Sequence, residues 1–145
     1  MFGINRFLIQ RRTIFSMSQV IGTPGVKWGD VEKSQWLTEQ KIQRSYQDEV
    51  LINIESFKDR FCVEKYGVLS FDSDRYPLYA VKCTNWDSTR DTIVVTGGVH
   101  GYETSGVQGS LRFIDTEMGN YSHKYNIVVA PCVSPWGYET INRWT

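Results

Sequence analysis

A histidine and a glutamate stand three residues apart in a glycine-rich stretch, where His100 follows Gly-Gly-Val and Glu103 follows Gly-Tyr. Imidazole nitrogen and carboxylate oxygen are ordinary zinc ligands, and a catalytic zinc site uses three protein ligands and a water molecule. The neighbouring glycines allow the backbone to bend tightly and leave room beside a metal ion. The same spacing also suits a turn histidine with satisfied hydrogen bonds, followed by a glutamate that starts a helix. Both interpretations stay open on these two residues alone.

The residues around this pair predict a strand, a helix and a second strand. The run TIVVTGG, at 92–98, is apolar and ends in glycine, as expected of a strand covered on both faces. A helix is expected over residues 103–117, followed by a second apolar strand, IVVAP, at 127–131. Two buried strands joined by a helix imply a parallel pair with a right-handed crossover.

This arrangement places the candidate ligands at one edge of a sheet. In α/β proteins, ligands bind beside the carboxyl ends of the parallel strands. His100 follows the first strand and residues 132–145, predicted to be a loop, follow the second, so the two segments should face each other. His123 follows a helix of about 15 residues, roughly 22 Å long, and should lie at the opposite end of the sheet.

The upstream part of the chain is predicted to add a long helix and two strands. A helical pattern runs from Val31 to Phe61, because apolar residues recur every three or four positions and form one stripe. The stripe consists of Ile42, Tyr46, Val50, Ile54, Phe57 and Phe61. The segments at 63–71 and 76–84 then predict two strands joined by the polar turn DSDR. The fold class expected is α/β, a mixed sheet with a parallel strand-helix-strand core.

The composition argues against several classes of partner. Lys and Arg together number 16, as do Asp and Glu, so no field of one sign is available to attract nucleic acid or an anionic membrane. No apolar run approaches the roughly 18 residues that span a bilayer. The cysteines, Cys62, Cys83 and Cys132, are odd in number and form no C-x-x-C pair. This favours a reducing compartment, and we expect a cytoplasmic protein.

The first 29 residues differ in character from the rest. They contain four basic residues and no acidic residue before Asp30. A short basic segment of this kind, here residues 1–16, is typical of a mitochondrial presequence; the alternative is an over-extended start with Met17 as the initiator. We therefore expect a flexible leader or over-extended N-terminus at 1–29 and a folded domain at 30–145.

Two longer segments carry a resemblance to a known family. VVTGGVHGYETSGVQGSLRFI, at 94–114, and NIVVAPCVSPWGYETINRW, at 126–144, resemble the zinc metallocarboxypeptidases of the carboxypeptidase A-like group. Relatives of that group include succinylglutamate desuccinylase and aspartoacylase. The match comprises the strand, the His-Gly-x-Glu turn, the helix, the next strand and a Pro-x-Gly-Tyr loop that ends near an arginine. More loosely it extends over residues 31–145, which implies the N-terminal part of a phosphorylase/hydrolase-like zinc carboxypeptidase domain.

The resemblance implies roles for three residues. His100 and Glu103 are the first two zinc ligands, and Arg143 is the arginine that polarises the scissile carbonyl and stabilises the oxyanion. A guanidinium suits that role because it is permanently charged and offers forked donors to a developing negative oxygen. The alternative for Arg143 is a solvated loop residue. The family commonly has Asn-Pro-Asp-Gly where this chain has Ser-Pro-Trp-Gly at 134–137, which indicates a divergent branch. The loop aromatics Trp136 and Tyr138 are candidates for a substrate pocket or for packing under the loop.

The resemblance also implies parts that this sequence does not contain. Family members place a third zinc ligand, a histidine, well downstream, together with an Asn-Arg pair that grips the substrate carboxylate and a glutamate base. Here Cys132 lies on the correct side for a soft ligand, but a buried structural thiol is the commoner role and we do not predict it as a ligand. Glu139 is the only nearby loop carboxylate, and nothing in the sequence places it beside the metal. We therefore expect a truncated domain, a weak or inactive enzyme by itself, whose apolar strand at 126–131 is left uncovered and favours aggregation.

The expected function is that of a zinc-dependent metallocarboxypeptidase-type hydrolase, which removes the C-terminal residue of a peptide. The alternative keeps the Zn2+ site and takes a small N-acyl amino acid as substrate, as a deacylase or amidohydrolase does. A third hypothesis, from another class, is a catalytically silent binding module that keeps the fold without turnover. Zinc binding separates this third hypothesis from the first two.

Overall fold

The structure, a computed structural model, describes residues 20–143 of the chain. The chain divides into two compact units, Met1–Glu39 and Gln40–Thr145. In the first unit the helix α1 spans Asp30–Glu39, and none of its residues is buried. The predicted presequence at 1–16 lies outside the described residues. The sheet and the predicted site residues belong to the second unit.

The single helix predicted from Val31 to Phe61 is wrong. Helix α1 ends at Glu39, and helical structure resumes with the π-helical segment η1, Gln47–Leu51, and the helix α2, Ile52–Ser56. Between them, the backbone N–H groups of residues 43 and 44 donate to the carbonyl oxygen of Glu139 at 2.7 and 3.2 Å. Hydrogen bonds to a distant segment thus replace the helical ones, which no local pattern in the sequence signals.

The prediction of the apolar stripe is largely confirmed. Its buried members are Tyr46, Val50, Ile54, Phe57 and Phe61. Ile42, in the non-helical stretch, is 53% exposed. The helical spacing therefore identified the face that packs into the core from residue 46 onward, where the helix forms.

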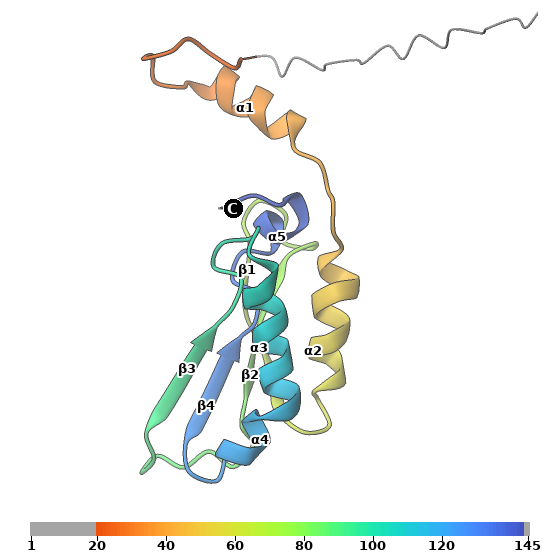
Figure 1. Cartoon of the computed structure of the whole chain (residues 1–145), viewed down its shortest axis with the longest axis vertical. Helices are drawn as coiled ribbons and strands as arrows, with labels where there is room; N and C mark the ends of the chain where they lie inside the picture. Colours follow the sequence, from red (N-terminus) through yellow and green to blue (C-terminus); the bar gives the residue numbers. More distant parts are fainter. Residues whose placement is uncertain (1–19, 144–145) are drawn as a thin grey trace, which may run out of the picture. The chain divides into compact units, whose positions relative to one another are not determined.

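A four-stranded mixed sheet forms the centre of the second unit (Figure 1). Its strand order is β1-β2-β4-β3, in which β1 pairs with β2 and β2 with β4 antiparallel, while β3 and β4 are parallel. The strands are β1 Cys62–Val68, β2 Pro77–Lys82, β3 Thr92–Thr96 and β4 Asn126–Ala130. This confirms the predicted α/β fold with a mixed sheet and a parallel strand-helix-strand core.

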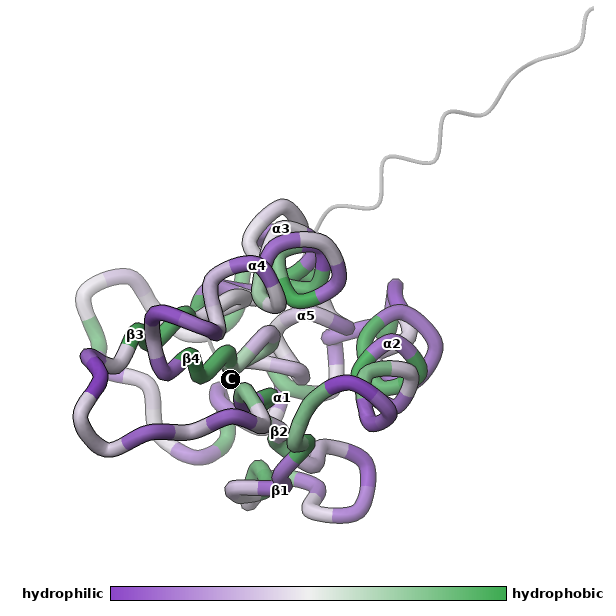
Figure 2. Tube along the Cα trace, turned by 90° about the horizontal axis from the view of Figure 1, so that it is seen from below, coloured by the Kyte–Doolittle hydropathy of each residue, from purple (hydrophilic) through white to green (hydrophobic). Residues whose placement is uncertain are grey.

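Helices connect β3 to β4 and cover the sheet on one side. The helix α3, Thr104–Thr116, and the short helix α4, Met118–Tyr121, form the crossover, as predicted. In Figures 1 and 2, α2, α3 and α4 lie on the same face of the sheet. Side chains with no exposed area fill this layer: Val50, Val81, Val107, Ile114, Met118, Ile127 and Val129. Burial of such a side chain stabilises the fold by about 1.5–3 kcal/mol, so this layer holds the strands in register.

The prediction that both apolar strands are covered on two faces holds for β4 and is wrong for β3. Strand β4 lies between β2 and β3 and is largely buried. Strand β3 is the edge strand, and its residues Ile93 and Val94 are 39% and 65% exposed. The uncovered apolar strand in the described residues is therefore β3 and not the predicted strand at 126–131.

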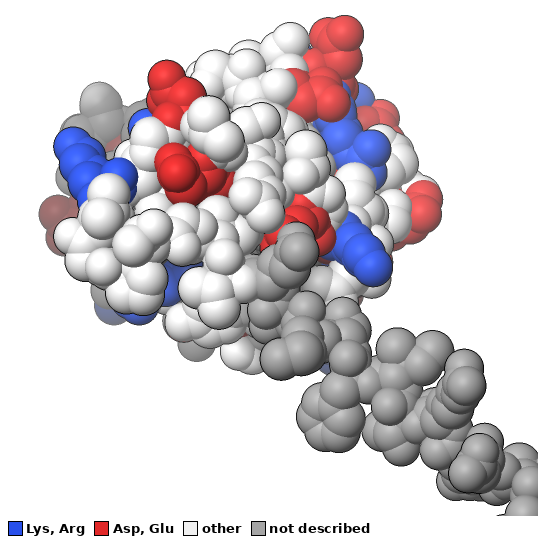
Figure 3. Space-filling view, turned by 90° about the horizontal axis from the view of Figure 1, so that it is seen from above, with Lys and Arg blue, Asp and Glu red and all other residues white. Residues whose placement is uncertain are grey.

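Charged side chains of both signs are interspersed over the face seen in Figure 3, which agrees with the balanced composition. Within residues 20–143, every helix is too short or too polar to span a bilayer.

Candidate metal centre

The turn between β3 and α3 carries both candidate metal ligands. Parallel pairing continues past the strand, because the N–H of Gly97 donates to the carbonyl oxygen of Ala130 at 2.8 Å. Gly98 then has φ +58°, a left-handed conformation that suits glycine. The chain turns there, so that His100 and Glu103 stand at the carboxyl end of β3, ahead of α3.

The two predicted ligands converge. The Nδ1 atom of His100 and the Oε1 atom of Glu103 are joined by a hydrogen bond of 2.9 Å, so the alternative of a turn histidine with satisfied hydrogen bonds stays open. The imidazole is 24% exposed and the carboxylate 49% exposed, so a solvent ion has access to both. Glu103 is the N-cap of α3, yet its side chain makes no capping hydrogen bond. The carboxylate is therefore directed toward His100 and not toward the helix end.

An aromatic ring lies against the histidine. The rings of Tyr102 and His100 stack, with centroids 5.9 Å apart and planes 12° from parallel. This contact covers one face of the imidazole and restricts its rotation. Sequence reasoning missed this role of Tyr102, because stacking depends on the turn geometry and leaves no spacing signal.

The segment that follows β4 lies opposite this turn, as predicted. The N–H groups of Val133 and Ser134 donate to the carbonyl oxygens of Gly97 and Gly98 at 3.0 and 2.9 Å. These bonds extend the pairing of the two strands beyond their ends. The loops after β3 and β4 therefore share one edge of the sheet.

A second pair of hydrogen bonds brings Arg143 to the same turn. The N–H of Gly101 donates to the carbonyl oxygen of Arg143 at 3.2 Å, and the N–H of Tyr102 donates to that of Asn142 at 3.0 Å. We call these two bonds the ladder. Its two donors lie between His100 and Glu103 in the chain, so the backbone of Arg143 lies beside the candidate ligands.

The segment predicted as a loop at 132–145 contains a helix. Helix α5 spans Pro135–Thr140, begins with proline, and all six of its residues are buried. Proline fits the first turn of a helix, which has no need of its N–H. Trp136 is 7% exposed and packs edge-on against Phe71, with ring centroids 5.9 Å apart, and Tyr138 is fully buried. Both aromatics therefore pack into the core, which agrees with the second of the two predicted roles.

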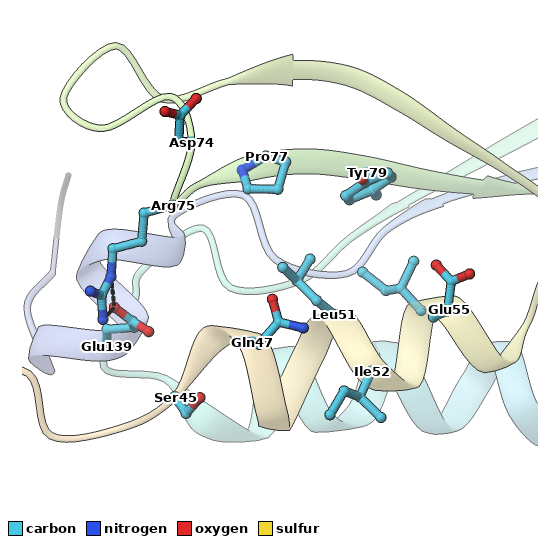
Figure 4. Close-up of a pocket in the computed structure, with 11 residues that line it drawn as sticks. Ser45, Gln47, Leu51, Ile52, Glu55, Asp74, Arg75, Pro77, Tyr79 and Glu139 are labelled. Atoms are coloured by element: carbon cyan, nitrogen blue, oxygen red, sulfur yellow. Dashed lines mark hydrogen bonds and ion pairs between the residues drawn. The ribbon is translucent and has the colours of Figure 1, made fainter.

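Glu139, considered above as a nearby carboxylate, is a structural residue. It is 3% exposed, and its Oε1 atom accepts the N–H of Tyr46 at 2.8 Å. Its Oε2 atom accepts the hydroxyl of Tyr76 and the guanidinium of Arg75, each at 2.8 Å. Burial and this hydrogen-bonded carboxylate raise the pKa of Tyr76 to about 12. Figure 4 shows the Arg75–Glu139 pair at one end of a cleft of about 680 Å³ that is lined by neither His100 nor Glu103.

Cys132 and His123 are not arranged as further ligands. Cys132 is 2% exposed, and burial raises the pKa of its thiol to about 12. His123 is exposed and follows α4, where the neighbouring Ser122 carbonyl accepts a hydrogen bond from Arg90, just before β3. This is the end of the sheet opposite His100, as predicted. Residues 20–143 contain no cluster of three or more His, Cys, Asp or Glu that could hold a metal ion.

Comparison with known proteins gives a likeness of fold. No protein-family model and no curated protein sequence matches the chain. Among solved structures, it is similar to a presumed metallopeptidase from Shewanella baltica, with TM-score 0.59 and 19% identity over 70% of this chain and 37% of the other. A presumed metallopeptidase from Shewanella amazonensis gives TM-score 0.56 and 22% identity over 69% and 35%. A presumed carboxypeptidase A from Shewanella denitrificans gives TM-score 0.55 and 19% identity over 71% and 29%. The chain has a carboxypeptidase-like fold and spans about a third of the length of these structures.

Proposed function

We propose that this chain forms the metal-binding edge of a zinc-dependent hydrolase of the metallocarboxypeptidase type. In this proposal His100 and Glu103 hold a zinc ion, and Arg143 binds the carbonyl oxygen of the substrate. The observation that carries the proposal is the convergence of the His100 imidazole and the Glu103 carboxylate at the carboxyl end of β3.

The donor geometry fits zinc. A tetrahedral zinc ion with ligand distances of about 2.0–2.2 Å holds two ligand atoms roughly 3.3 Å apart. His100 Nδ1 and Glu103 Oε1 are joined by a hydrogen bond of 2.9 Å. Zinc would take the place of this hydrogen bond, and the two atoms would move apart by a few tenths of an ångström. Both side chains are partly exposed, which allows the movement.

Arg143 supplies the charge that the chemistry requires. A bound zinc ion lowers the pKa of its water toward about 7 and polarises a carbonyl group. The ladder holds the Arg143 backbone beside the ligands. In this proposal its guanidinium donates to the same carbonyl oxygen. A guanidinium stays charged at every relevant pH, so Arg143 needs no proton transfer of its own to bind the oxyanion.

The proposed substrate is a peptide with a free C-terminal carboxylate. The described residues offer two metal ligands, whereas catalytic zinc sites have three, so we expect weak hydrolysis by this chain alone. The fold similarity to presumed metallopeptidases supports the peptide over the alternative substrate, an N-acyl amino acid.

The test is a hydrolysis assay at high protein concentration. Zinc-loaded protein is incubated with an N-blocked dipeptide and, separately, with an N-acetyl amino acid, and the released amino acid is quantified by chromatography. We expect slow release from the dipeptide that a chelator stops. Arg143→Ala should lower this rate about a hundredfold, as loss of an oxyanion donor does. Arg112→Ala, which removes a 76%-exposed arginine from α3, is the matched control and should leave the rate unchanged.

Two outcomes would overturn the proposal. Release from the N-acetyl amino acid alone would replace the peptidase with a deacylase. No zinc-dependent release from either substrate, together with no zinc bound by the wild type, would favour a silent binding module.

A further inference from the structure

One residue beside the candidate metal centre has a backbone conformation that its side chain disfavours. Ile141 has φ 56° and ψ 41°, in the left-handed region, and is the single non-glycine residue with positive φ in residues 20–143. A β-branched residue is an outlier in this region because its Cβ crowds the following carbonyl oxygen. Its side chain is 39% exposed, so deep burial does not offset the strain.

The conformation ends helix α5. The N–H groups of Ile141 and Asn142 both donate to the carbonyl oxygen of Gly137, the latter at 2.9 Å. Glycine usually occupies the left-handed position after a helix. In this chain an isoleucine occupies it, at the point where the chain leaves a buried helix for the candidate site.

The residues on either side of the chain reversal at Ile141 are held by other contacts. Before Ile141, α5 is held by the buried Glu139 carboxylate, which bonds to Arg75 (Figure 4) and to the hydroxyl of Tyr76. After Ile141, the Asn142 side chain donates to Gln40 Oε1 at 2.8 Å and to Thr140 Oγ1 at 2.9 Å. Strained residues persist only where their surroundings over-determine them, and these contacts meet that condition.

The backbone strain at Ile141 acts most directly against the two hydrogen bonds of the ladder. The carbonyl groups of Asn142 and Arg143 accept the N–H groups of Tyr102 and Gly101 only while the chain reverses at Ile141. If Ile141 returned to an ordinary conformation, the path of the two following residues would change and the ladder would open. The strain therefore favours opening, and the ladder together with the Asn142 side chain opposes it.

We propose that Ile141 is a positioning residue that makes the Arg143 segment a hinge, held closed on the His100 turn against backbone strain. The relevance of this hinge to chemistry rests on the proposed function of Arg143. A residue without the strain would hold the ladder more firmly, so the isoleucine sets how readily Arg143 leaves and regains its place. Opening of the chain at Ile141 would let a substrate carbonyl enter between the His100 turn and residues 142–143. Arg143 would then close on that carbonyl.

Amide hydrogen exchange of the metal-free protein tests the hinge. Exchange at Gly101 and Tyr102 is compared between wild type and Ile141→Gly, with the buried β4 residue Val129 as an internal reference for global stability. Relief of a left-handed penalty of about 1–2 kcal/mol predicts exchange about 5- to 30-fold slower at Gly101 and Tyr102, relative to Val129. Ile141→Ala shortens the side chain but keeps a penalty, so its effect should be smaller than that of glycine.

Asn142→Ala should change amide exchange in the opposite direction. Loss of its bonds to Gln40 and Thr140 should make both ladder amides exchange faster relative to Val129. Equal exchange in wild type and Ile141→Gly, or a larger slowing by alanine than by glycine, would overturn the hinge. Because no metal is used, these results do not depend on zinc binding, and the proposed function can fail while the hinge stands.

Discussion

The backbones of Gly101 and Gly137 are in direct contact. A Cβ atom on Gly101 would lie 1.9 Å from the carbonyl carbon of Gly137, far inside van der Waals distance. Only glycine at position 101 allows this approach, and the approach places the turn that carries His100 against helix α5. The same approach makes the ladder to Arg143 geometrically feasible.

Replacing this glycine should break the site and destabilise the fold. Gly101→Ala forces the backbones of residues 101 and 137 apart. We expect the free energy of unfolding to fall by several kcal/mol, which is at the upper end for point substitutions. Gly109→Ala is the control, because a Cβ at Gly109, within α3, would meet nothing within 4 Å. Alanine is favoured there by about 1 kcal/mol, so that variant should melt higher than wild type. Two variants with the same thermal midpoint would contradict the close packing.

The Glu139 carboxylate should contribute strongly to stability. Glu139→Gln keeps the shape of the side chain but removes the negative charge to which Arg75 and Tyr76 both donate. We expect the free energy of unfolding, measured by chemical denaturation, to fall by about 2–4 kcal/mol. Glu55→Gln is the matched control, since its pair with Lys58 is exposed on both sides. Such exposed pairs contribute about 0–1 kcal/mol. A similar loss in both variants would show that Glu139 is not the anchor of α5.

Stability should fall in alkali, beginning with Cys132. Burial raises the pKa of this thiol from 9.0 to about 12, and burial likewise raises the pKa of Tyr138 from 10.0 to about 12. The folded state therefore holds these protons more tightly than the unfolded state. Their contribution is complete below about pH 9 and is lost as the pH rises toward 12.

Urea denaturation between pH 7 and 11 measures this effect. We expect the free energy of unfolding of the wild type to decline from about pH 9, and that of Cys132→Ala to decline only from about pH 10, where tyrosine begins to titrate. An unchanged onset in Cys132→Ala would assign the decline to another group.

The exposed edge strand should promote self-association. Val94 in β3 is 65% exposed, and within residues 20–143 this strand pairs on one side only. Strands with an unpaired edge tend to pair with other chains. Val94→Lys should reduce association in sedimentation velocity at high protein concentration. Val20→Lys alters a valine that is 81% exposed outside any strand and serves as the control. If the two lysine variants associate equally, β3 is not the contact.

Local patterns were sufficient to predict the centre of the fold. The two apolar runs, the amphipathic helix between them and the glycines after the first run indicated β3, α3 and β4 and the edge where His100 lies. These features depend on residues near each other in sequence, whose periodicity reports which face is buried.

Features that depend on distant residues could not be predicted. The helix break after Glu39 is accompanied by hydrogen bonds to the Glu139 carbonyl, nearly a hundred residues away. The exposure of β3 follows from strand order, which an apolar run does not specify. The strain at Ile141 leaves no compositional signal, because glycine is the residue expected there.

Zinc binding at His100 and Glu103 can be measured by isothermal titration calorimetry, with the metal content checked by mass spectrometry. We expect the wild type to bind one zinc ion per chain and both His100→Ala and Glu103→Ala to lose this binding. His123→Ala, which removes the exposed histidine at the opposite end of the sheet, should bind as the wild type does. A wild type that binds no zinc, or one whose binding survives both substitutions, would show that His100 and Glu103 are not zinc ligands.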